Sequence, residues 1–386
     1  MKVLHLIRKN SQLKASFILN QIQNHINYRP LVAFYEERSK AFDGGFSNSD
    51  DSDFEVFSLD AKPGLFSKLR YKIFKIISTS SKRRLIKLIQ EQKPEIIHLH
   101  YGTDAGLFLP TISKVGLPTV VSFYGYECSG FPRLFFGVGK WYLKYRVFRH
   151  ATFVLAMSED MRQDLLAIGC PDEKIKVHYY GTDVMHFYNK IEPRDSELTK
   201  FLIISGFTPQ KGHRYLIEAF ALAYTQNKNI RLTIVGAGPI EDEIKAWVGA
   251  TGLNSVIDLP GPVVYGSVEH QDYFKGHDVF IHPSVTDING DKEGIPGALV
   301  EAMAAGLPVI STFHAGIPHI IENGKEGMLA EERDVAALTS YILKLASDRA
   351  FCTKIATAGQ ERTLRELDLK KNEQNLEQIY ELAAFL

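Results

Sequence analysis

Residues 293–312 read EGIPGALVEAMAAGLPVIST and place two glutamates, Glu293 and Glu301, eight positions apart. Two glycines and a proline between them disfavour a helix before residue 297, and proline is favoured where a helix begins. We therefore expect Glu293 on a loop and Glu301 one turn inside the following helix. The apolar run LPVIST at 307–312 then predicts a buried strand.

The two acids suggest a binding site around the start of that helix. The loop acid can fold back over the helix N-terminus, whose free N–H groups favour anions. Such a pocket offers amides to phosphates and two carboxylates to hydroxyl groups, which suits a nucleotide sugar. An ordinary helix with acids near its first turn explains the spacing equally well, so the spacing alone leaves both interpretations open.

Strand-like apolar runs alternate with helix-like segments on both sides of this stretch. Apolar runs between helices are typical of buried parallel strands. The polar segment 191–200 contains Pro193 and predicts a linker. The chain is thus expected to form two doubly wound α/β domains, with ligands at the carboxyl ends of the strands. We expect strands in 2–7, 95–100, 118–125, 151–158, 200–207, 230–238, 256–262, 278–285 and 307–312, and helices in 81–92, 215–226 and roughly 369–385.

The composition is typical of a globular protein. The length of 386 residues suits two domains better than one. Lys+Arg and Asp+Glu both number 45, so the net charge is zero and general nucleic-acid binding is disfavoured. The three cysteines, Cys128, Cys170 and Cys352, show no metal-binding or disulfide spacing. The N-terminal apolar run is too short for a signal peptide, and no run approaches the roughly 18 residues of a membrane span. We expect a cytoplasmic protein that could lie peripherally on the inner membrane face.

The segment HPSVTDINGDKEGIPGALVEAMAAGLPVISTFHAGIPHII, residues 282–321, resembles the retaining glycosyltransferases of family 4, whose signature is E-x7-E. The resemblance extends along most of the chain in several separated motifs. It implies the GT-B fold, in which two Rossmann-like doubly wound domains face a deep cleft. Residues 1–190 would bind the acceptor and residues 191–368 the nucleotide sugar, and the helix at 369–386 would pack back on the N-terminal domain.

On the donor side, the resemblance implies roles for both glutamates. Glu293 would contact hydroxyls of the donor sugar during catalysis, and Glu301 would bind the ribose. The block SGFTPQKGHRYLIEAF, residues 205–220, is similar to the family's phosphate-binding segment, in which Lys211 would neutralise the diphosphate. The further donor-binding candidates are Gly294, Ile295 and Pro296 on the acidic loop, Gly206 before the lysine, and Gly236 and Gly238 in VGAGP near the nucleotide base.

On the acceptor side, SFYGYECS at 122–129 resembles the family's TxHGxD segment. Its histidine, which lies beside the reacting sugar, is Tyr124 here. A tyrosine can donate a hydrogen bond to a sugar hydroxyl, but with a pKa of about 10 it is a poor base near neutral pH. We count Tyr124 with Glu293 and Lys211 as the catalytic candidates, and we expect His98 to be a packed histidine that faces elsewhere. The acceptor-side candidates are Gly125 and Glu127 of this segment, Ser16 and Phe17 of NSQLKASFILNQI at 10–22, and His100 and Gly102 of IIHLHYGTD at 96–104.

Four family residues are replaced in this sequence, by Tyr124, Phe207, Ala15 and His319. Phe207 stands where an arginine is usual, so one expected cation is absent unless Arg214 replaces it. The replacements slightly favour a non-catalytic partner subunit that binds a nucleotide sugar and stabilises an active transferase. A nucleotide-sugar epimerase of similar fold is a second alternative, and the context of the two glutamates weakens it.

The function that the resemblance implies is that of a retaining, hexosyltransferase-type glycosyltransferase. It would move a sugar from a UDP- or GDP-sugar to an acceptor hydroxyl in bacterial polysaccharide or glycolipid assembly. The departing diphosphate would take the acceptor's proton, while Lys211 and helix amides stabilise the negative charge. No cofactor and no metal is expected.

Two basic stretches fall in the N-terminal half. Residues 62–93 hold ten Lys or Arg and one acid, and residues 131–150 hold five Lys or Arg, no acid and seven aromatics. Such a mixture suits contact with an anionic membrane or with a lipid-linked acceptor in place of a free carbohydrate. A solvated helix face is an equally good explanation. No RNA-binding module is readable, so no nucleic-acid partner is expected.

Overall fold

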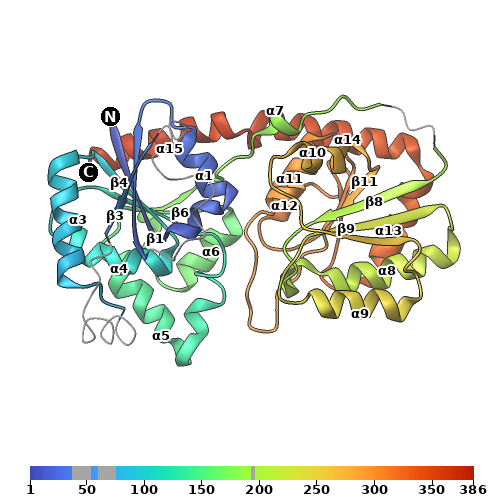
Figure 1. Ribbon diagram of the computed structural model, residues 1–386, viewed down its shortest axis with the longest axis horizontal. Helices are drawn as coiled ribbons and strands as arrows, with labels where there is room; N and C mark the ends of the chain where they lie inside the picture. Colours follow the sequence, from blue (N-terminus) through green and yellow to red (C-terminus); the bar gives the residue numbers. More distant parts are fainter. Residues whose placement is uncertain (37–53, 60–74, 193–195) are drawn as a thin grey trace. The chain divides into compact units, whose positions relative to one another are not determined.

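The computed structural model describes residues 1–36, 54–59, 75–192 and 196–386, with the backbone alone at positions 14, 16 and 135. These residues form two compact units (Figure 1). The first comprises Met1–Gly181 with Leu369–Leu386, and the second comprises Thr182–Asp368. In the described ranges, no helix has both the length and the apolar character that crossing a membrane requires.

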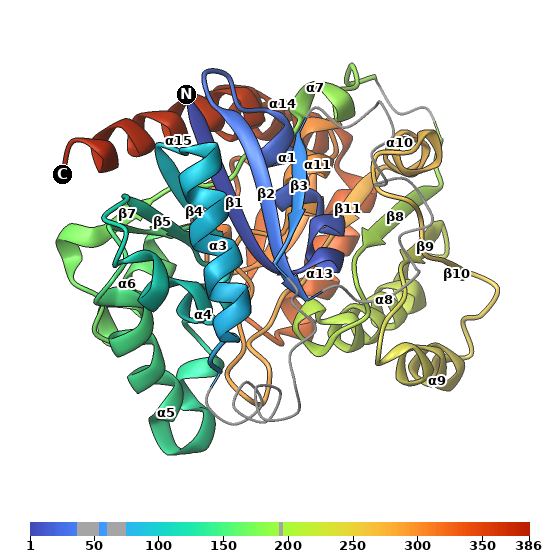
Figure 2. The ribbon, with the colours of Figure 1, turned by 60° about the vertical axis from the view of Figure 1, so that its left-hand side comes forward.

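A seven-stranded parallel sheet forms the centre of the first unit, in the spatial order β3-β2-β1-β4-β5-β6-β7 (Figure 2). Its central strands are buried on both faces because helices cover both sides, as in doubly wound folds, and the buried polar side chains of β1 and β4 are His5, His98 and His100. The strands are β1 (Lys2–Lys9), β2 (Arg29–Glu36), β3 (Glu55–Ser58), β4 (Ile96–His100), β5 (Thr119–Ser122), β6 (Phe153–Ala156) and β7 (Ile175–Val177).

Six described helices belong to this unit, and two of them begin at a serine cap. The Ser78 side chain accepts a hydrogen bond from Ser81 N, and Ser158 accepts one from Met161 N. Such caps satisfy N–H groups that the helix itself leaves free. The helices are α1 (Ser16–Gln23), α3 (Thr79–Gln92), α4 (Gly102–Ile112), α5 (Leu134–Leu143), α6 (Glu159–Ala167) and α15 (Leu369–Ala384).

The last helix, α15, is part of the core of the first unit. Leu376, Tyr380 and Ala383 are buried against apolar side chains of β1, β4, β5 and β6. Gly181 allows the chain to leave this unit next to the point where it returns. It has a φ of 76°, and a Cβ there would lie 2.6 Å from the Leu369 Cα, so no other residue fits.

A six-stranded parallel sheet forms the second unit, in the order β10-β9-β8-β11-β12-β13. The strands are β8 (Thr199–Ile204), β9 (Ile230–Val235), β10 (Ile257–Gly261), β11 (Val279–Ile281), β12 (Val309–Thr312) and β13 (Met328–Ala330). The helices are α7 (Val184–Phe187), α8 (His213–Gln226), α9 (Glu241–Thr251), α10 (Val268–Lys275), α11 (Gly297–Ala304), α12 (Ile317–Ile320), α13 (Val335–Ser347) and α14 (Arg349–Arg362).

The structure confirms the expected parallel α/β architecture: each of the nine segments expected to be strands contains one, and the three expected helices are α3, α8 and α15. The segment 191–200 differs from the linker that was expected, because β8 begins inside it, and its residues 193–195 lie outside the described residues. The units divide at Gly181, before the expected boundary at 190, because α7 packs against α11 of the second unit.

The packing of α15 predicts the stability of the first unit. Replacing Tyr380 by Ala removes a fully buried aromatic ring and should lower the free energy of unfolding by about 3–5 kcal/mol. The matched control is Leu382→Ala on the same helix, where the side chain is exposed and the loss should stay within about 0.5 kcal/mol. Chemical denaturation measures both, and equal losses would show that α15 is not part of the core.

Candidate functional site

The donor-side candidates lie where the strand order of the second sheet reverses, between β8 and β11. The loops that follow these two strands pack on each other. A Cβ on Gly212 would lie 1.9 Å from the Pro283 carbonyl oxygen, and Val285 N donates a hydrogen bond of 2.8 Å to Gln210 O. The packing holds Lys211 at the start of α8, beside the loop that carries the acids.

Lys211 and Glu293 form an ion pair across these two loops. Ser284 Oγ donates to Glu293 Oε1 at 3.0 Å. Burial by itself would raise the pKa of the Glu293 carboxyl, but Lys211 and His282 outweigh burial and lower that pKa to about 2. Glu293 is therefore an anion at neutral pH, able to accept hydrogen bonds from hydroxyl groups.

Glu301 lies in a different environment. It is the fifth residue of α11, which begins at Gly297 directly after Pro296, so the expected loop and helix positions of the two glutamates are confirmed. Its side chain is buried beside Tyr265, and His270 Nε2 lies 3.8 Å from its Oε2. Burial raises the pKa of the Glu301 carboxyl to about 8, against the hydrogen bond from Tyr265.

The remaining donor-side candidates shape the backbone of the site. Gly294 O accepts a hydrogen bond from Gly316 N at 3.2 Å, which fixes the acidic loop, while Ile295 is buried. A Cβ on Gly236 would lie 1.9 Å from Ser205 O. One on Gly238 would lie 2.4 Å from Phe207 O, so both glycines allow the loop after β9 to pack on the loop after β8, whereas a Cβ on Gly206 would meet open space.

The cation that the sequence lacks is not supplied by Arg214. Phe207 is buried in the core of the second unit. Arg214 lies on the exposed side of α8, and its Nε donates to Glu218 Oε1 at 2.8 Å, one helical turn away. Lys211 is thus the cation that this segment brings to the acidic loop.

Two residues near Glu293 were missed by the sequence analysis. His314 Nε2 accepts a hydrogen bond from Glu293 N at 3.2 Å, and its Nδ1 lies 2.6 Å from Glu332 Oε1. Glu332 also accepts from Thr286 N at 2.9 Å. His314 follows β12 and Glu332 follows β13, so the rule that sites gather at the carboxyl ends of strands would have found them.

The acceptor-side candidates gather at the corresponding edge of the first sheet, beyond β1, β4 and β5. The Tyr124 hydroxyl lies 2.7 Å from His100 Nδ1. The ring of Phe17 lies 4.7 Å from that of Tyr124, and the ring of Tyr101 lies 4.9 Å from it. Ser16 begins α1 in the same loop region, but its side chain lies outside the described atoms.

Glu127 holds the backbone of this region. Its carboxylate accepts hydrogen bonds of 3.2 Å from Gly102 N and from Tyr124 N. Burial raises the pKa of Glu127 to about 7, and the backbone hydrogen bonds oppose the rise. Gly102 leaves room for the ring of Phe123, since a Cβ there would lie 2.2 Å from it, and Gly125 takes a φ of 137°. These three candidates position the loops that carry Tyr124.

His98 corrects one expectation. It was predicted to face away from His100, yet the two rings stack with centroids 4.5 Å apart. Residues two apart on a strand share a face, so the prediction was wrong. His98 is nevertheless packed and satisfied as expected, because its nitrogens lie 2.6 Å from the Tyr380 hydroxyl and 2.8 Å from Ser122 Oγ.

In the part of the chain that the structure describes, two groups of side chains bring nitrogen or oxygen atoms close enough to surround an ion: His5 with His98 and His100, and His25 with Glu373 and Glu377. These atoms already contact protein partners, and a metal would have to displace those contacts. The first group belongs to the hydrogen-bond network of the first unit, whereas Glu373 in the second has, among the described residues, only its ion-pair contact with His25. The expectation that no metal is used stays a prediction.

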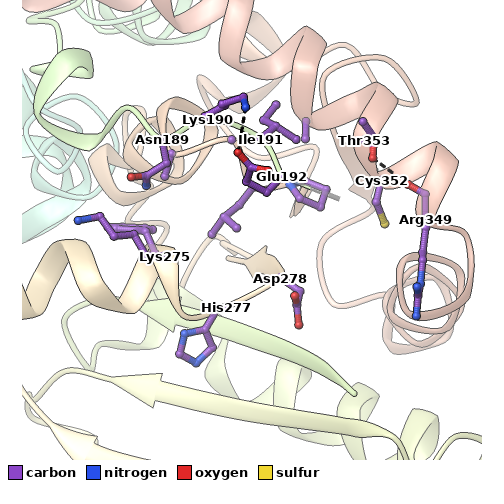
Figure 3. A pocket seen from close by; sticks show the side chains of 16 residues that line it. Asn189, Lys190, Ile191, Glu192, Lys275, His277, Asp278, Arg349, Cys352 and Thr353 are labelled. Carbon is purple, nitrogen blue, oxygen red and sulfur yellow. Dashed lines mark hydrogen bonds and ion pairs between the residues drawn. The ribbon is translucent and has the colours of Figure 1, made fainter. Parts of the chain in front are cut away.

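A cavity of about 490 Å³ lies elsewhere in the second unit (Figure 3). Its walls include Asp278 and Pro308, directly before β11 and β12, and the Lys190–Glu192 ion pair of 3.2 Å. It therefore lies at the amino ends of those strands. None of the candidate donor residues lines it, and doubly wound sheets bind ligands at the opposite edge.

Two family models match the chain. The model for glycosyltransferase family 4 matches residues 47–186, and the model for glycosyl transferases group 1 matches residues 185–362. The chain belongs to the glycosyltransferases of family 4. This membership favours an enzyme of sugar transfer over the epimerase and the non-catalytic partner subunit considered from the sequence.

Relatives and solved structures agree with this membership. A glycosyltransferase of Salmonella typhimurium assigned to colanic acid biosynthesis, WcaL, is 27% identical over 95% of this chain and 96% of its own length. The amylovoran biosynthesis glycosyltransferase AmsK of Erwinia amylovora is 33% identical over 62% of this chain and 58% of its own. Anabaena HepE, crystallised with UDP, is 19% identical and superposes with a TM-score of 0.78 over 98% of this chain and 99% of its own. Sucrose-phosphate synthase of Thermosynechococcus elongatus reaches the same TM-score at 15% identity, with 99% and 98% covered. These likenesses establish the GT-B fold.

The opposite environments of the two glutamates predict opposite pH dependence of stability. The pKa of Glu301 is raised from 4.5 to about 8, so on raising the pH the unfolded chain loses the Glu301 proton before the folded chain does. The free energy of unfolding therefore falls as the pH rises from 4.5 to about 8. Glu301→Gln lacks this loss. Its free energy of unfolding relative to wild type should therefore rise by up to about 1.4 kcal/mol per pH unit between these values and stay flat below them.

Glu293→Gln is the matched control, because the lowered pKa of Glu293 moves its window to between 4.5 and about 2. The free energy of unfolding of wild type relative to this variant should fall only as the pH drops through that window. It should not change between pH 5 and 8. Denaturation at a series of pH values measures both. A pH-independent difference for Glu301→Gln would contradict the assignment.

Proposed function

We propose that this enzyme transfers a hexose from a UDP- or GDP-hexose to an acceptor hydroxyl, with retention of the anomeric configuration, in the assembly of a bacterial polysaccharide or glycolipid. The observation that carries the proposal is the Lys211–Glu293 pair at the switch point of the second unit. It sets one cation and one ionised acid side by side, where a diphosphate and a sugar need them.

In this proposal Lys211 turns from Glu293 to the donor diphosphate. Its ammonium and the free amides at the start of α8, directly after Gly212, stabilise the charge that grows on the diphosphate as the glycosidic bond breaks. Glu293, held by Ser284 and His314, then accepts hydrogen bonds from sugar hydroxyls. Glu301, one turn inside α11, accepts those of the ribose.

Retention without a covalent intermediate is supported by the state of the acid nearest to Tyr124 in sequence. Glu127 uses both carboxylate oxygens on backbone amides and is 2% exposed, so it is not placed to attack a sugar. Attack by the acceptor from the face that the diphosphate leaves needs no such nucleophile. The catalytic work is then electrostatic, with Tyr124 contacting the reacting substrate.

The relatives support the proposed biological role. AmsK and WcaL carry names from the biosynthesis of the exopolysaccharides amylovoran and colanic acid. HepE has been crystallised with UDP, and also with UDP-glucose. A relative from Mycobacterium tuberculosis is named as a GDP-mannose-dependent mannosyltransferase. These names support a nucleoside-diphosphate hexose and leave UDP and GDP as the two bases to test.

The two glutamates should separate binding from turnover. Glu301→Ala should weaken UDP or GDP binding by about 0.5–1.5 kcal/mol, roughly twofold to tenfold, because the ribose loses a hydrogen bond to a carboxyl group whose raised pKa keeps it largely neutral at pH 7. Glu293→Ala should lower kcat more than it weakens nucleotide binding. Calorimetry and product analysis by mass spectrometry measure these effects, with exposed Arg214→Ala as the control. Wild-type binding and turnover in both glutamate variants would refute the assigned roles.

We further propose that α5 docks on an anionic membrane that holds a lipid-linked acceptor. The helix exposes Phe136, Val138 and Trp141, and the basic side chains of Lys140 and Lys144 are exposed beside them. Apolar side chains flanked by cations favour insertion at an anionic interface. In the other basic stretch, Arg83, Arg84 and Lys87 of α3 are exposed, whereas residues 62–74 lie outside the described residues.

Trp141 reports this docking directly. Its emission should move to shorter wavelength when phosphatidylglycerol vesicles are added, since the exposed indole would leave water. Neutral phosphatidylcholine vesicles should produce little change, and salt near 1 M should reverse the shift because it screens charges beyond about 3 Å. Trp141→Phe leaves only Trp247 of the second unit and should remove the signal. The same shift with neutral vesicles, or no shift, would contradict docking by charge.

A further inference from the structure

Five side chains of the first unit form a continuous chain of polar contacts that begins at Tyr124, with three hydrogen bonds followed by one short histidine–carboxylate contact. The Tyr124 hydroxyl lies 2.7 Å from His100 Nδ1, and His100 Nε2 lies 2.9 Å from His5 Nδ1. His5 Nε2 lies 2.8 Å from His25 Nε2, and His25 Nδ1 contacts the carboxylate of Glu373. Each histidine therefore uses both ring nitrogens, one toward each neighbour.

The chain runs from the candidate site into the core. His5 lies on β1, His100 ends β4, and Glu373 comes from α15 at the far end of the sequence. His5 and His100 are fully buried, and the side chains of His25 and Glu373 are each 1% exposed. Tyr124 is half-buried. Among the described residues neither Glu373 oxygen has a hydrogen-bond partner, and His25 Nδ1 is the nitrogen in ion-pair contact with Glu373. The described geometry therefore leaves Tyr124 as the end of the chain that a substrate can reach.

With an ionised Glu373 and neutral imidazoles, the direction of every bond in the chain is fixed. An ionised carboxylate only accepts, so a neutral His25 would donate to it from Nδ1 and accept at Nε2. His5 must then donate from Nε2 and accept at Nδ1, which makes His100 donate from Nε2 and accept at Nδ1. The Tyr124 hydroxyl hydrogen would then point to His100, and the Tyr124 oxygen, which also has a hydrogen bond with Ser122, would accept from the substrate.

We propose that this chain is a proton wire, which carries the proton of the acceptor hydroxyl from Tyr124 to Glu373 during transfer. The proposal rests on the proposed function and deepens it. It gives the proton to the protein instead of to the departing diphosphate, and it makes Tyr124 an acceptor from the substrate hydroxyl instead of a donor to it. Glycosyl transfer removes a proton only from the acceptor hydroxyl, so that is the hydroxyl that Tyr124 meets.

The transfer balances over five hops. As the acceptor oxygen bonds to the sugar, its proton passes to the Tyr124 oxygen, and the Tyr124 proton passes to His100 Nδ1. His100 gives its Nε2 proton to His5 Nδ1, and His5 gives its Nε2 proton to His25 Nε2. His25 gives its Nδ1 proton to Glu373. Every imidazole ends neutral in its other tautomer, and nothing is oxidised or reduced. When products leave, Tyr124 releases a proton to water and the chain returns to its first direction.

The titration behaviour of the members suits a wire. Burial lowers the pKa of His5 well below its usual value and that of His100 to about 3, so neither imidazole rests as a cation. Burial also raises the pKa of Tyr124, which disfavours a phenolate that would trap the charge at the site. Burial raises the pKa of Glu373, so this carboxylate is the member that binds the extra proton.

The groups that face Glu373 are His25 from the loop after α1, and Glu377 and Tyr380 from its own helix. Glu377 accepts hydrogen bonds of 2.7 and 2.8 Å from the backbone N–H groups of Ile26 and Asn27. Burial is the main cause of the raised pKa of Glu373, the neighbouring Glu377 adds to the rise, and His25 opposes it. Acidification should thus protonate Glu373 first and reverse the chain.

Nitrogen NMR of the full chain labelled with ¹⁵N-histidine tests the wire without any reaction. At neutral pH, His25 should carry its proton on Nδ1, and His5 and His100 should carry theirs on Nε2. On acidification all three tautomers should invert with one midpoint, because protonated Glu373 becomes a donor. Glu373→Gln should abolish this common inversion, and His5→Gln should uncouple His100 from His25. Fixed tautomers, separate midpoints or stoichiometric bound metal would overturn the wire.

Kinetics test whether catalysis uses the wire. Glu373→Gln and His5→Gln should lower kcat by about a hundredfold, with the donor KM within about threefold of wild type, because both keep hydrogen-bonding groups but cannot pass the proton. Wild-type kcat should fall as the pH drops through the midpoint seen by NMR. The kcat of Glu373→Gln should not show this fall at acidic pH. The matched control is His98→Gln, a buried neighbour outside the chain, whose kcat should stay within about threefold.

The outcomes separate this inference from the proposed function. A common tautomer inversion with unchanged kcat in Glu373→Gln and His5→Gln would overturn the catalytic use of the wire while sugar transfer stands. A loss in His98→Gln equal to that in His5→Gln would show a packing effect and overturn it as well. If wild type transferred no sugar from any UDP- or GDP-hexose, the proposed function would fail, and the catalytic use of the wire with it. The NMR result would still report whether the wire exists.

Discussion

The strand order of each sheet is the constraint on which the rest of the structure depends. After β1 the chain crosses over toward one edge of the first sheet, and after β4 it crosses over toward the other edge. The same reversal occurs between β8 and β11 in the second sheet. The loops beyond those strands diverge and open a crevice at their carboxyl ends. Lys211 and Glu293 stand on the two loops of one crevice, and His100 and Phe17 on those of the other. Each set belongs to a single unit.

Burial then gives identical carboxyl groups different chemistry. Glu293 is buried beside a lysine and stays ionised, whereas burial raises the pKa of Glu301 to about 8 despite its hydrogen bond with Tyr265. Both carboxylate oxygens of Glu127 accept hydrogen bonds from backbone amides. Glu373 contacts one histidine, His25, at the end of the chain of polar contacts. The partner that each acid meets in the core therefore decides whether it accepts hydroxyls, positions a loop or binds a proton.

The sequence predicted the features that depend on local pattern. The strands followed from apolar runs between helices, and the loop and helix positions of Glu293 and Glu301 followed from the glycines and proline between them. The face of His98 could also have been predicted from the two-residue period of a strand, and the prediction failed because that period was not applied. His314 could likewise have been predicted, because it follows β12 and sites gather at the carboxyl ends of strands.

Other features could not be predicted from local pattern, because they depend on contacts between distant segments. Nothing in the spacing of α15 indicates that Glu373 meets His25, or that Tyr380 meets His98. The boundary at Gly181 likewise depends on the packing of α7 against α11. Such contacts arise only when the sheet and its crossovers place the segments together, and they supply the partners that set each side chain's protonation.

The central claim is that the chain transfers a hexose from a nucleoside-diphosphate sugar with retention. The most direct measurement needs no acceptor: the purified enzyme is incubated with its tightest-binding α-linked nucleotide sugar, and the slow hydrolysis product is followed by proton NMR before it mutarotates. The account predicts that the α-anomer of the free sugar appears first. Initial release of the β-anomer would contradict it.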